Sequence, residues 1–458
     1  MSTAANSPRA ELGALARHAG AVYVGQVAVM AFGLADTFVA ARHSGEALAA
    51  LSVGSAVYIS IFVALMGALQ AQLPIWAELR GAGRRDELGF SVRQSLYLAA
   101  AASAIGMVLL LVPGPLLAVT EIPTALQGEV RHYLALLACA LPPALLFRLY
   151  STLNQSLGKP RLVTWIQIGS LFLKVPLSLL LVFGAGPLPA LGLAGCAWST
   201  VIVNWTMLGL AAWMLRHRAL YQPYQLWRRP EPPHGPTLRG FARLGLPTGL
   251  SIMVEVTSFT LMALFIARQG TVAAASHQIA ASMTALLYMT PLALGIAASA
   301  RVSYWLGARE PQQARLALRL GFALTLALAL VMGGAVLAFH GALARLFAGT
   351  NLPVVAAAAT LLPWVAVYHL FDALQAVSVF VLRSFGVATA SLVVYCVLLW
   401  GVGLGGGYWL AYVGPGGDGG LQTPAAFWGT AALALALTAA AFLLLLRRAV
   451  RQALPVQA

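Results

Sequence analysis

The chain has 458 residues, of which 60% are hydrophobic and only 9% are charged. Soluble globular domains carry about a quarter charged residues, so this composition excludes that class and indicates a polytopic membrane protein. A net charge of +15 would suggest nucleic-acid binding in a soluble chain, but its distribution along the sequence argues against that partner. A membrane span needs about 20 apolar residues, so this length accommodates about a dozen spans and no separate soluble domain.

Apolar runs separated by short polar segments follow one another along the whole chain. They predict helices over residues 18–41, 46–72, 91–119, 131–157, 161–184 and 191–215, two helices within 244–307, and helices over 315–340, 353–382, 389–412 and 425–446. A Pro- and Arg-rich segment at 216–238 interrupts the pattern and is the one convincing linker. The sequence therefore predicts an all-α integral membrane protein with twelve transmembrane helices in two pseudo-symmetric six-helix lobes, residues 1–215 and 239–458.

The basic residues predict the orientation of these helices. If the N-terminus is cytoplasmic, 22 of the 28 Lys and Arg residues fall in cytoplasmic segments, Arg383 among them. Four fall on the opposite side, and Arg148 and Lys174 lie within helices. This is the positive-inside bias of an inserted bundle, so both termini are expected in the cytoplasm.

Three short segments of the first half recur in the second half. AARHSG at 40 resembles IARQGT at 266, ELRGAGR at 78 resembles YWLGARE at 304, and LNQSLGKPR at 153 resembles VLRSFGVAT at 381. The three matches occur in the same order and at nearly one offset, which predicts an internal repeat. Because six helices separate equivalent positions, the halves share one orientation and an axis along the membrane normal. A substrate cavity is expected between them.

Three carboxylates are predicted at membrane depth, since the other acids of the 13 fall in loops or tails. They are Asp36 in the first half and Glu255 and Asp372 in the second. A carboxylate at bilayer depth disfavours insertion by roughly 2.5–3.5 kcal/mol, so it usually faces a cavity and serves ions or substrate. The alternative is a carboxyl that hydrogen-bonds to a neighbouring helix. The uneven division means that the two lobes are not chemically symmetric.

Lys174 lies in the apolar run GSLFLKVPLSLLLVFG, and Asp36 is the only acid at membrane depth in the same half. Counted at ~1.5 Å per residue from the outer helix ends, Asp36 lies ~7 Å deep and Lys174 ~15 Å deep. A long lysine side chain can cover much of that gap, so we predict an ion pair. The alternative is a lysine that snorkels or lines the cavity alone.

Side chains near these acids complete the predicted site. The supporting polar residues are Ser178, Gln278, Tyr288 and Tyr368, and the candidate cavity walls are Tyr150, Met253, Phe259 and Met283. Such aromatic and Met side chains suit a flat organic cation, although in so apolar a bundle most of them pack between helices. The sequence contains no metal-ligand or phosphate-binding motif, which predicts a protein that is not an enzyme and uses no metal or cofactor.

Several extended segments carry a family resemblance. GLADTFVAARHSGEALAALSVG, PIWAELRGAGRRDEL and LPTGLSIMVEVTSFTLMALF, with SHQIA and ARVSYWLGARE, resemble the NorM-like branch of the multidrug and toxic compound extrusion (MATE) transporters. The resemblance implies a two-lobed, twelve-helix protein of the bacterial inner membrane that exports cationic drugs by antiport with H⁺ or Na⁺. It also implies that Asp36, Glu255 and Asp372 are the family's cation-site acids.

Lys174 departs from the family pattern, which has asparagine at this position and again at the position of Ser178. An ammonium offers no oxygen ligand and repels Na⁺, so we expect H⁺ coupling in the first lobe, while Na⁺ at the second-lobe acids stays open. The alternative function is a flippase for a lipid-linked saccharide or lipid precursor, whose cavity would be lined by several Arg or Lys. The expected partners are small cationic drugs and membrane lipid, with no nucleic acid, and the chain is expected to act as a monomer.

Overall fold

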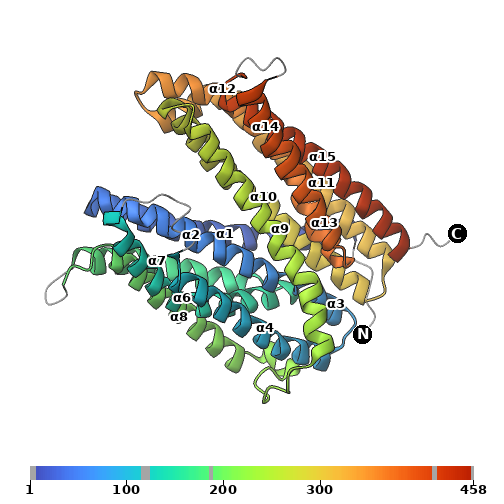
Figure 1. The fold of residues 1–458 in the computed structure, drawn as a ribbon. Coiled ribbons are helices and arrows are strands. Elements are labelled where there is room, and N and C mark those ends of the chain that lie inside the picture. The colour runs from blue at the N-terminus through green and yellow to red at the C-terminus, as the bar shows by residue number, and fades with distance from the viewer. Residues whose placement is uncertain (1–6, 115–123, 185–188, 415–419, 455–458) are drawn as a thin grey trace. The chain divides into compact units, whose positions relative to one another are not determined.

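The computed structural model describes residues 7–114, 124–184, 189–414 and 420–454. Within these ranges the regular structure is helical, and twelve helices are long and apolar enough to cross a membrane. Helices satisfy their own backbone groups, which the apolar interior of a bilayer requires. The predicted fold class is therefore confirmed. By their internal contacts the residues form two units, Val24–Gly249 and Met1–Tyr23 with Leu250–Ala458 (Figure 1).

The unit Val24–Gly249 is organised around α6 (Thr124–Ser156), which packs against α2, α4 and α8. Leu134, Leu141 and Leu145 of α6 are fully buried in its core. The other elements of this unit are the second part of α1 (Pro8–His43), α2 (Gly45–Gln70), α3 (Leu73–Gly81), α4 (Arg85–Leu111), α7 (Arg161–Phe183), α8 (Leu193–His217), the short 3-10 helix η1 (Ala219–Tyr224) and the first part of α9 (Gly235–Ala267).

The unit formed by Met1–Tyr23 and Leu250–Ala458 is organised around α12 (Leu352–Ser384). This helix packs against α10 (Thr271–Gly307), α11 (Pro311–Ala348) and α15 (Pro424–Ala453). Between α12 and α15 the chain forms one further span, Thr389–Val413. That span comprises α13 (Thr389–Tyr395), the π-helical η2 (Cys396–Gly405), α14 (Gly406–Tyr408) and the π-helical η3 (Trp409–Val413).

The helix boundaries repeat with the spacing that the sequence predicts. α2 begins at Gly45 and α10 at Thr271, and the ends of α3 and α10, Gly81 and Gly307, are separated by the same interval. The starts of α4 and α11 are also separated by this interval, and the ends of α6 and α12 by nearly the same one. The boundaries thus follow the predicted internal repeat. One continuous helix in the second half corresponds to the pair α2 and α3, which a turn at residues 71–72 separates in the first half.

The first helix begins earlier than the apolar pattern predicts. α1 starts at Pro8 instead of residue 18, and Ser7 Oγ accepts a hydrogen bond from the Ala10 amide at 3.3 Å. Glu11, which the pattern places in a polar tail, is fully buried and forms an ion pair with Arg301 of α10. A pairing between residues so distant in the sequence leaves no signal in local hydrophobicity, which explains the error.

The third predicted helix is shorter than expected. α4 ends at Leu111, and residues 115–119 of the helix predicted over 91–119 lie outside the described residues.

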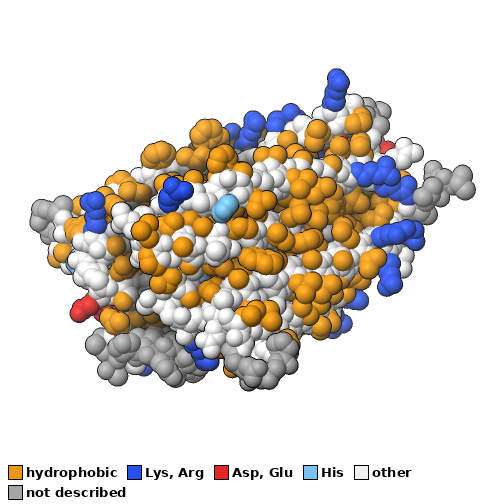
Figure 2. All heavy atoms as spheres, turned by 90° about the horizontal axis from the view of Figure 1, so that it is seen from above, with side chains coloured by type: hydrophobic (Ala, Val, Ile, Leu, Met, Phe, Trp, Pro, Cys, Tyr) orange, Lys and Arg blue, Asp and Glu red, His pale blue; other side chains and the backbone are white. Residues whose placement is uncertain are grey.

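Large apolar side chains are exposed on many spans, for example Phe172 at 75% and Leu346 at 75%. Figure 2 shows hydrophobic side chains over much of one face, with Lys and Arg mostly toward its margins. This is the pattern of a surface that contacts lipid.

The segment at 216–238, predicted to be a linker, runs beside α4 in the unit Val24–Gly249. Arg93 Nε donates to Glu231 Oε2 at 2.8 Å, and the Tyr97 hydroxyl donates to the Glu231 carbonyl at 2.9 Å. Gln94 Nε2 also donates to the Pro232 carbonyl at 3.0 Å. The segment is therefore fixed along one edge. The lobe boundaries at 1–215 and 239–458 stay a prediction.

Candidate functional site

The predicted ion pair between α1 and α7 is present. Lys174 Nζ lies 2.9 Å from Asp36 Oδ1, and the two residues are 1% and 8% exposed. Removing two charges from water is costly, so a buried pair persists only where further hydrogen bonds satisfy both groups. The geometry therefore shows the pairing and excludes, for this state, the snorkelling lysine.

The surroundings of the pair supply those further hydrogen bonds. Lys174 Nζ donates to the Cys196 carbonyl at 3.3 Å, to Ser199 Oγ at 2.8 Å and to Thr200 Oγ1 at 2.7 Å. The three acceptors lie on one face of α8, at spacings of three and four residues. An ammonium has three N–H donors, so with Asp36 it has one more acceptor than it needs.

Ser178, a predicted supporting residue, completes this cluster on the Asp36 side. Its Oγ donates to Asp36 Oδ1 at 3.1 Å and lies 2.8 Å from Ser199 Oγ. The contribution of α8 was not predicted from the sequence. The run of small residues CAWST at 196–200 is its only sequence signal, and it does not indicate which helix these residues face.

In the other unit, Glu255 on α9 lines a small cavity of about 30 Å³ together with Phe259 and Tyr368. Glu255 is half-buried, and within the described part of the chain its carboxyl makes no hydrogen bond or ion pair. Because one water needs about 10–15 Å³ of such volume, the cavity holds about two waters at most. All three residues belong to the site predicted from the sequence, and they come from α9 and α12; their role in transport stays a prediction.

Asp372 on α12 is 2% exposed and accepts a hydrogen bond from Gln375 Nε2 at 2.9 Å. The Tyr395 hydroxyl of α13 donates in turn to Gln375 Oε1. Tyr288 of α10, a predicted supporting residue, is half-buried. Asp372 is thus connected to the neighbouring α13 through one hydrogen-bonded chain.

Aromatic rings pack around Phe259, which lines the Glu255 cavity together with Tyr368. The Phe259 ring centroid lies 6.1 Å from that of His277, 6.2 Å from that of Tyr368 and 5.8 Å from that of Trp428. Trp428, on α15, was not predicted, because an aromatic residue in an apolar run carries no signal that separates packing from binding. The electron-rich faces of such rings attract cations.

The other predicted residues lie in varied surroundings. Met283 is buried, whereas Gln278 is exposed and Met253 is 39% exposed. Tyr150 lies in the unit Val24–Gly249, where its hydroxyl accepts a hydrogen bond from the Tyr221 hydroxyl of η1 at 3.4 Å. These placements do not test a role in binding, which stays a prediction.

Two arginines, Arg148 and Arg383, are buried within the helices. Arg148 Nη2 donates to Gln70 Oε1 at 3.0 Å. Arg383, which the pattern of basic residues places in a cytoplasmic segment, is the penultimate residue of α12 and only 5% exposed. Its burial within the protein was not predicted, and its assignment to the cytoplasmic side stays a prediction.

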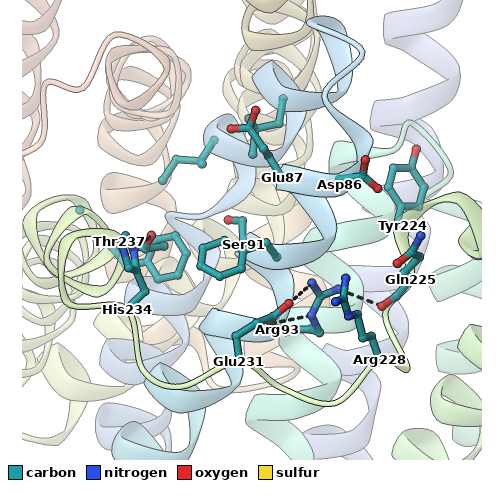
Figure 3. Close-up of a pocket in the computed structure, with 15 residues that line it drawn as sticks. Asp86, Glu87, Ser91, Arg93, Tyr224, Gln225, Arg228, Glu231, His234 and Thr237 are labelled. Carbon is teal, nitrogen blue, oxygen red and sulfur yellow. Dashed lines mark hydrogen bonds and ion pairs between the residues drawn. The ribbon is translucent and has the colours of Figure 1, made fainter.

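A larger cavity, of about 880 Å³, lies beside the segment at 216–238 (Figure 3). Figure 3 shows Arg93 pointing toward Glu231 and Gln225, with Asp86 and Glu87 on the other side of the cavity. The Arg93 guanidinium lowers the pKa of the Glu231 carboxyl from 4.5 to about 2 through hydrogen bonds to its charged form. This ion pair therefore persists at neutral pH.

Comparison with known proteins gives consistent matches over most of the chain. The family model MatE matches residues 21–180 and 247–409. The probable multidrug resistance protein NorM of Aromatoleum aromaticum is 39% identical over 447 residues, which are 97% of this chain and 96% of that protein. The multidrug resistance protein PmpM of Pseudomonas aeruginosa is 32% identical over 447 residues, covering 96% of this chain and 92% of that protein.

A solved structure supports the fold independently. The crystal structure of the Vibrio cholerae MATE transporter VcmN in the bent form matches with a TM-score of 0.85 and 18% identity. The match covers 97% of this chain and 98% of that chain. Sequence and fold therefore point to the same group of membrane proteins.

Proposed function

The chain belongs to the MatE family of multidrug and toxic compound extrusion transporters, and on that premise we propose that it exports organic cations by antiport with H⁺. The twelve long apolar helices found among the described residues and the bacterial relatives support a multi-pass protein of the bacterial inner membrane. The proposal on substrate is supported by the printed names of the relatives, which are multidrug resistance proteins.

The observation that carries H⁺ coupling is the ion pair of Asp36 and Lys174. The Lys174 ammonium lies 2.9 Å from the Asp36 carboxylate, and the four oxygens within reach of it more than satisfy its three N–H groups. A second cation at this position would be repelled by the fixed charge at short range. A proton, by contrast, binds to the Asp36 oxygen without displacing the lysine.

Protonation of Asp36 removes the charge that holds α1 to α7. Lys174 then still has the Cys196 carbonyl, Ser199 and Thr200 as acceptors for its three N–H groups, so the protonated state leaves no donor unsatisfied. Two arrangements of α1 and α7 with similar hydrogen bonding are thereby available. A bistable element of this kind converts a local charge change into a change of helix packing.

We assign the organic cation to the second group of acids. Glu255 supplies the negative charge, while Phe259 and Tyr368 supply aromatic faces in the same cavity. A drug-sized ligand needs a pocket of about 300–1,000 Å³, so the 30 Å³ cavity must open before it binds.

We further propose that both termini face the cytoplasm and that the chain works as a monomer. Orientation is supported by the excess of Lys and Arg in the segments assigned to that side. A monomer is supported because the ion pair of Asp36 with Lys174 and the hydrogen bond of Asp372 with Gln375 both form within one chain. A C-terminal fluorescent-protein fusion, which fluoresces only when the C-terminus is cytoplasmic, tests the orientation, and light scattering of the purified protein tests the oligomeric state.

The function is tested by transport of ethidium in proteoliposomes. We expect an imposed pH gradient without Na⁺ to drive transport and a Na⁺ gradient at equal pH to drive none. Asp36→Asn should abolish the response to the pH gradient, because it cannot bind or release the proton. Asp86→Asn, which changes an exposed acid of the same unit, is the matched control and should transport as the wild type does.

Transport driven only by Na⁺ would refute H⁺ coupling while leaving the exporter assignment intact. A lack of transport for several organic cations, together with movement of a lipid-linked saccharide between leaflets, would replace the exporter with a flippase. The two failures are therefore distinct.

A further inference from the structure

A further cavity of the unit Val24–Gly249, of about 450 Å³, lies between α7 and α8. Its walls are mostly apolar and include Trp165 and Leu173 of α7 and Leu210 of α8. These three residues are 70%, 40% and 45% exposed, so the cavity opens on the outer surface of the two helices. An exposed apolar surface on a membrane span faces lipid, and the occupant should therefore come from the bilayer.

The length of the cavity matches one leaflet of a bilayer. Its lining residues lie within 162–173 on α7 and within 206–218 at the end of α8. At ~1.5 Å per residue these stretches are ~16 Å and ~18 Å long, and one leaflet contributes about half of a hydrocarbon core of about 30 Å. The Leu191 amide, just before α8, donates to the Leu181 carbonyl at 3.0 Å, so the two helices are antiparallel. The start of α7 and the end of α8 therefore lie at the same end of the cavity.

That end of the cavity is basic. Lys159 and Arg161 lie at the start of α7, Arg216 and Arg218 lie at the end of α8, and all four are exposed. Arg218 lines the cavity, and within the described part of the chain its guanidinium makes no hydrogen bond or ion pair. No acidic residue lines the cavity, and none occurs between positions 129 and 231 of the sequence. An apolar wall one leaflet deep thus ends at a group of cations without acidic neighbours in sequence.

We propose that this cavity binds one anionic phospholipid, with an acyl chain along the apolar wall and the phosphate on the Arg218 guanidinium. A planar guanidinium can donate two parallel hydrogen bonds to a phosphate. Basic pockets between transmembrane helices attract acidic head groups. The orientation proposed above places this lipid in the cytoplasmic leaflet. A zwitterionic lipid brings its own cation close to the other basic side chains and should bind less tightly.

Two other occupants fit the cavity less well. An organic cation finds no carboxylate among the lining residues and is repelled by Arg218. A second copy of the chain, inserted with the same orientation and packed through the same face, brings two sets of basic side chains to one depth. Like charges would then face each other across that interface.

The lipid contacts both helices that form the ion-pair cluster of this unit. Lys174 follows Leu173 of the cavity wall on α7, and its acceptors Ser199 and Thr200 lie on α8. A ligand that binds only the folded state stabilises that state by mass action. Anionic phospholipid should therefore raise the melting temperature of the protein.

Binding is tested by native mass spectrometry of the delipidated full chain, titrated with phosphatidylglycerol or with phosphatidylcholine of identical acyl chains. We expect one phosphatidylglycerol to bind about tenfold more tightly than phosphatidylcholine, a difference of about 1.4 kcal/mol. Arg218→Gln should bind the two lipids equally, because the phosphate loses its partner. Arg229→Gln removes the same charge at an exposed arginine of the same unit that does not line the cavity, and should bind as the wild type does.

The position of the acyl chain is tested by filling the cavity. Gly169 of α7 lines it, and a Cβ added there meets no other atom within 4 Å, so the side chain of Gly169→Leu can enter the cavity without a clash. Leucine also favours the helix over glycine. We expect this variant to lose at least tenfold in affinity for both lipids. Gly209→Leu, at a glycine of α8 that is equally open but outside the cavity lining, is the matched control and should bind as the wild type does.

Equal affinity of the wild type for the two lipids, or unchanged phosphatidylglycerol binding by Gly169→Leu, would overturn the proposal. Equal losses from Arg218→Gln and Arg229→Gln would also overturn it, because they indicate diffuse attraction to the basic surface. A dimer of the delipidated wild type that Gly169→Leu dissociates would assign the cavity to a second copy of the chain. Thermal unfolding is the independent readout, since phosphatidylglycerol should raise the melting temperature of the wild type and leave that of Gly169→Leu unchanged. None of these measurements involves transport, so their failure would leave the proposed export function intact.

Discussion

The two units of this protein handle buried charge in opposite ways. In the unit Val24–Gly249, Asp36 and Lys174 contact one another at 2.9 Å, and the lysine has three further acceptors. In the other unit, neither Glu255 nor Arg383 makes a hydrogen bond or an ion pair among the residues that the structure describes, and the Arg383 guanidinium lies over the Phe380 ring, 4.4 Å from its centroid. One unit thus contains an ion pair, and the other contains a half-buried carboxyl and a buried guanidinium without one.

This difference suits a separation of the two binding steps of the proposed antiport, in which one unit binds the proton and the other binds the organic cation. Under the proposed H⁺ coupling, the satisfied pair of Asp36 and Lys174 admits a proton, which binds to the carboxylate oxygen itself. In the same proposal, the unpaired Glu255 carboxyl beside aromatic rings accepts the larger organic cation. The repeat makes the helix boundaries of the two halves similar, while the side chains at equivalent depths are different.

The largest expected effect on stability comes from removing one partner of the ion pair between Asp36 and Lys174. Lys174→Met leaves the Asp36 carboxylate buried without its cation, which typically costs about 3–5 kcal/mol. The double variant Asp36→Asn with Lys174→Met should recover most of that loss. Thermal unfolding in detergent measures both. Lys159→Met, at an exposed lysine of the same unit, is the control.

The two residues of this pair should contribute unequally to the stability of the protein. Asp36→Asn should destabilise the protein less than Lys174→Met does, because the Lys174 ammonium keeps three acceptors after the change. Equal losses from the two variants would mean that the α8 acceptors do not hold the lysine, and would weaken the proposed proton switch.

In the unit with unsatisfied charges, the expected effect is on transport more than on stability. Asp372→Asn keeps an oxygen that can accept the hydrogen bond from Gln375, so the fold should remain intact. The negative charge is lost, and we expect ethidium efflux from vesicles to be abolished; Glu255→Gln should have the same effect on efflux. Wild-type efflux from both variants would show that these acids serve structure alone.

The sequence predicted the membrane class, the spans, the repeat and the pairing of Asp36 with Lys174. Each depends on a pattern that the bilayer imposes along the chain, or on a rare charge inside an apolar run. It did not predict the partners supplied by α8, the Trp428 ring or the pairing of Glu11 with Arg301. Those depend on which helix faces meet, and apolar periodicity is weak in helices surrounded by lipid.

Arg383 shows the same limit in another form. Its sequence position correctly places it at the end of a span, and the direction of its side chain decides that it is buried. Helix geometry could have placed Arg383 and Asp372 on one face in advance, since about three full turns separate them. The residue type alone favoured the membrane surface.

A smaller effect is expected from changing the cation specificity of the satisfied pair. Lys174→Asn replaces the ammonium with a carbonyl oxygen, which can join Asp36, Ser178 and Thr200 around a cation. We expect this variant to gain transport in response to a Na⁺ gradient, measured in proteoliposomes at equal pH. Continued dependence on the pH gradient alone would indicate that the lysine does not exclude Na⁺.

The smallest effect concerns a third pair, Arg93 with Glu231, whose carboxylate lies outside the spans and is partly exposed to water. The pKa of Glu231 is lowered from 4.5 to about 2, so its charge stabilises the folded protein above pH 4.5, and this contribution is lost as the pH falls toward 2. We expect the wild type to melt at most a few degrees above Glu231→Gln at pH 7, because water screens such a pair. That difference should disappear near pH 2. A difference that persists there would mean that Glu231 acts through its backbone contacts with Gln94 and Tyr97, and not through its charge.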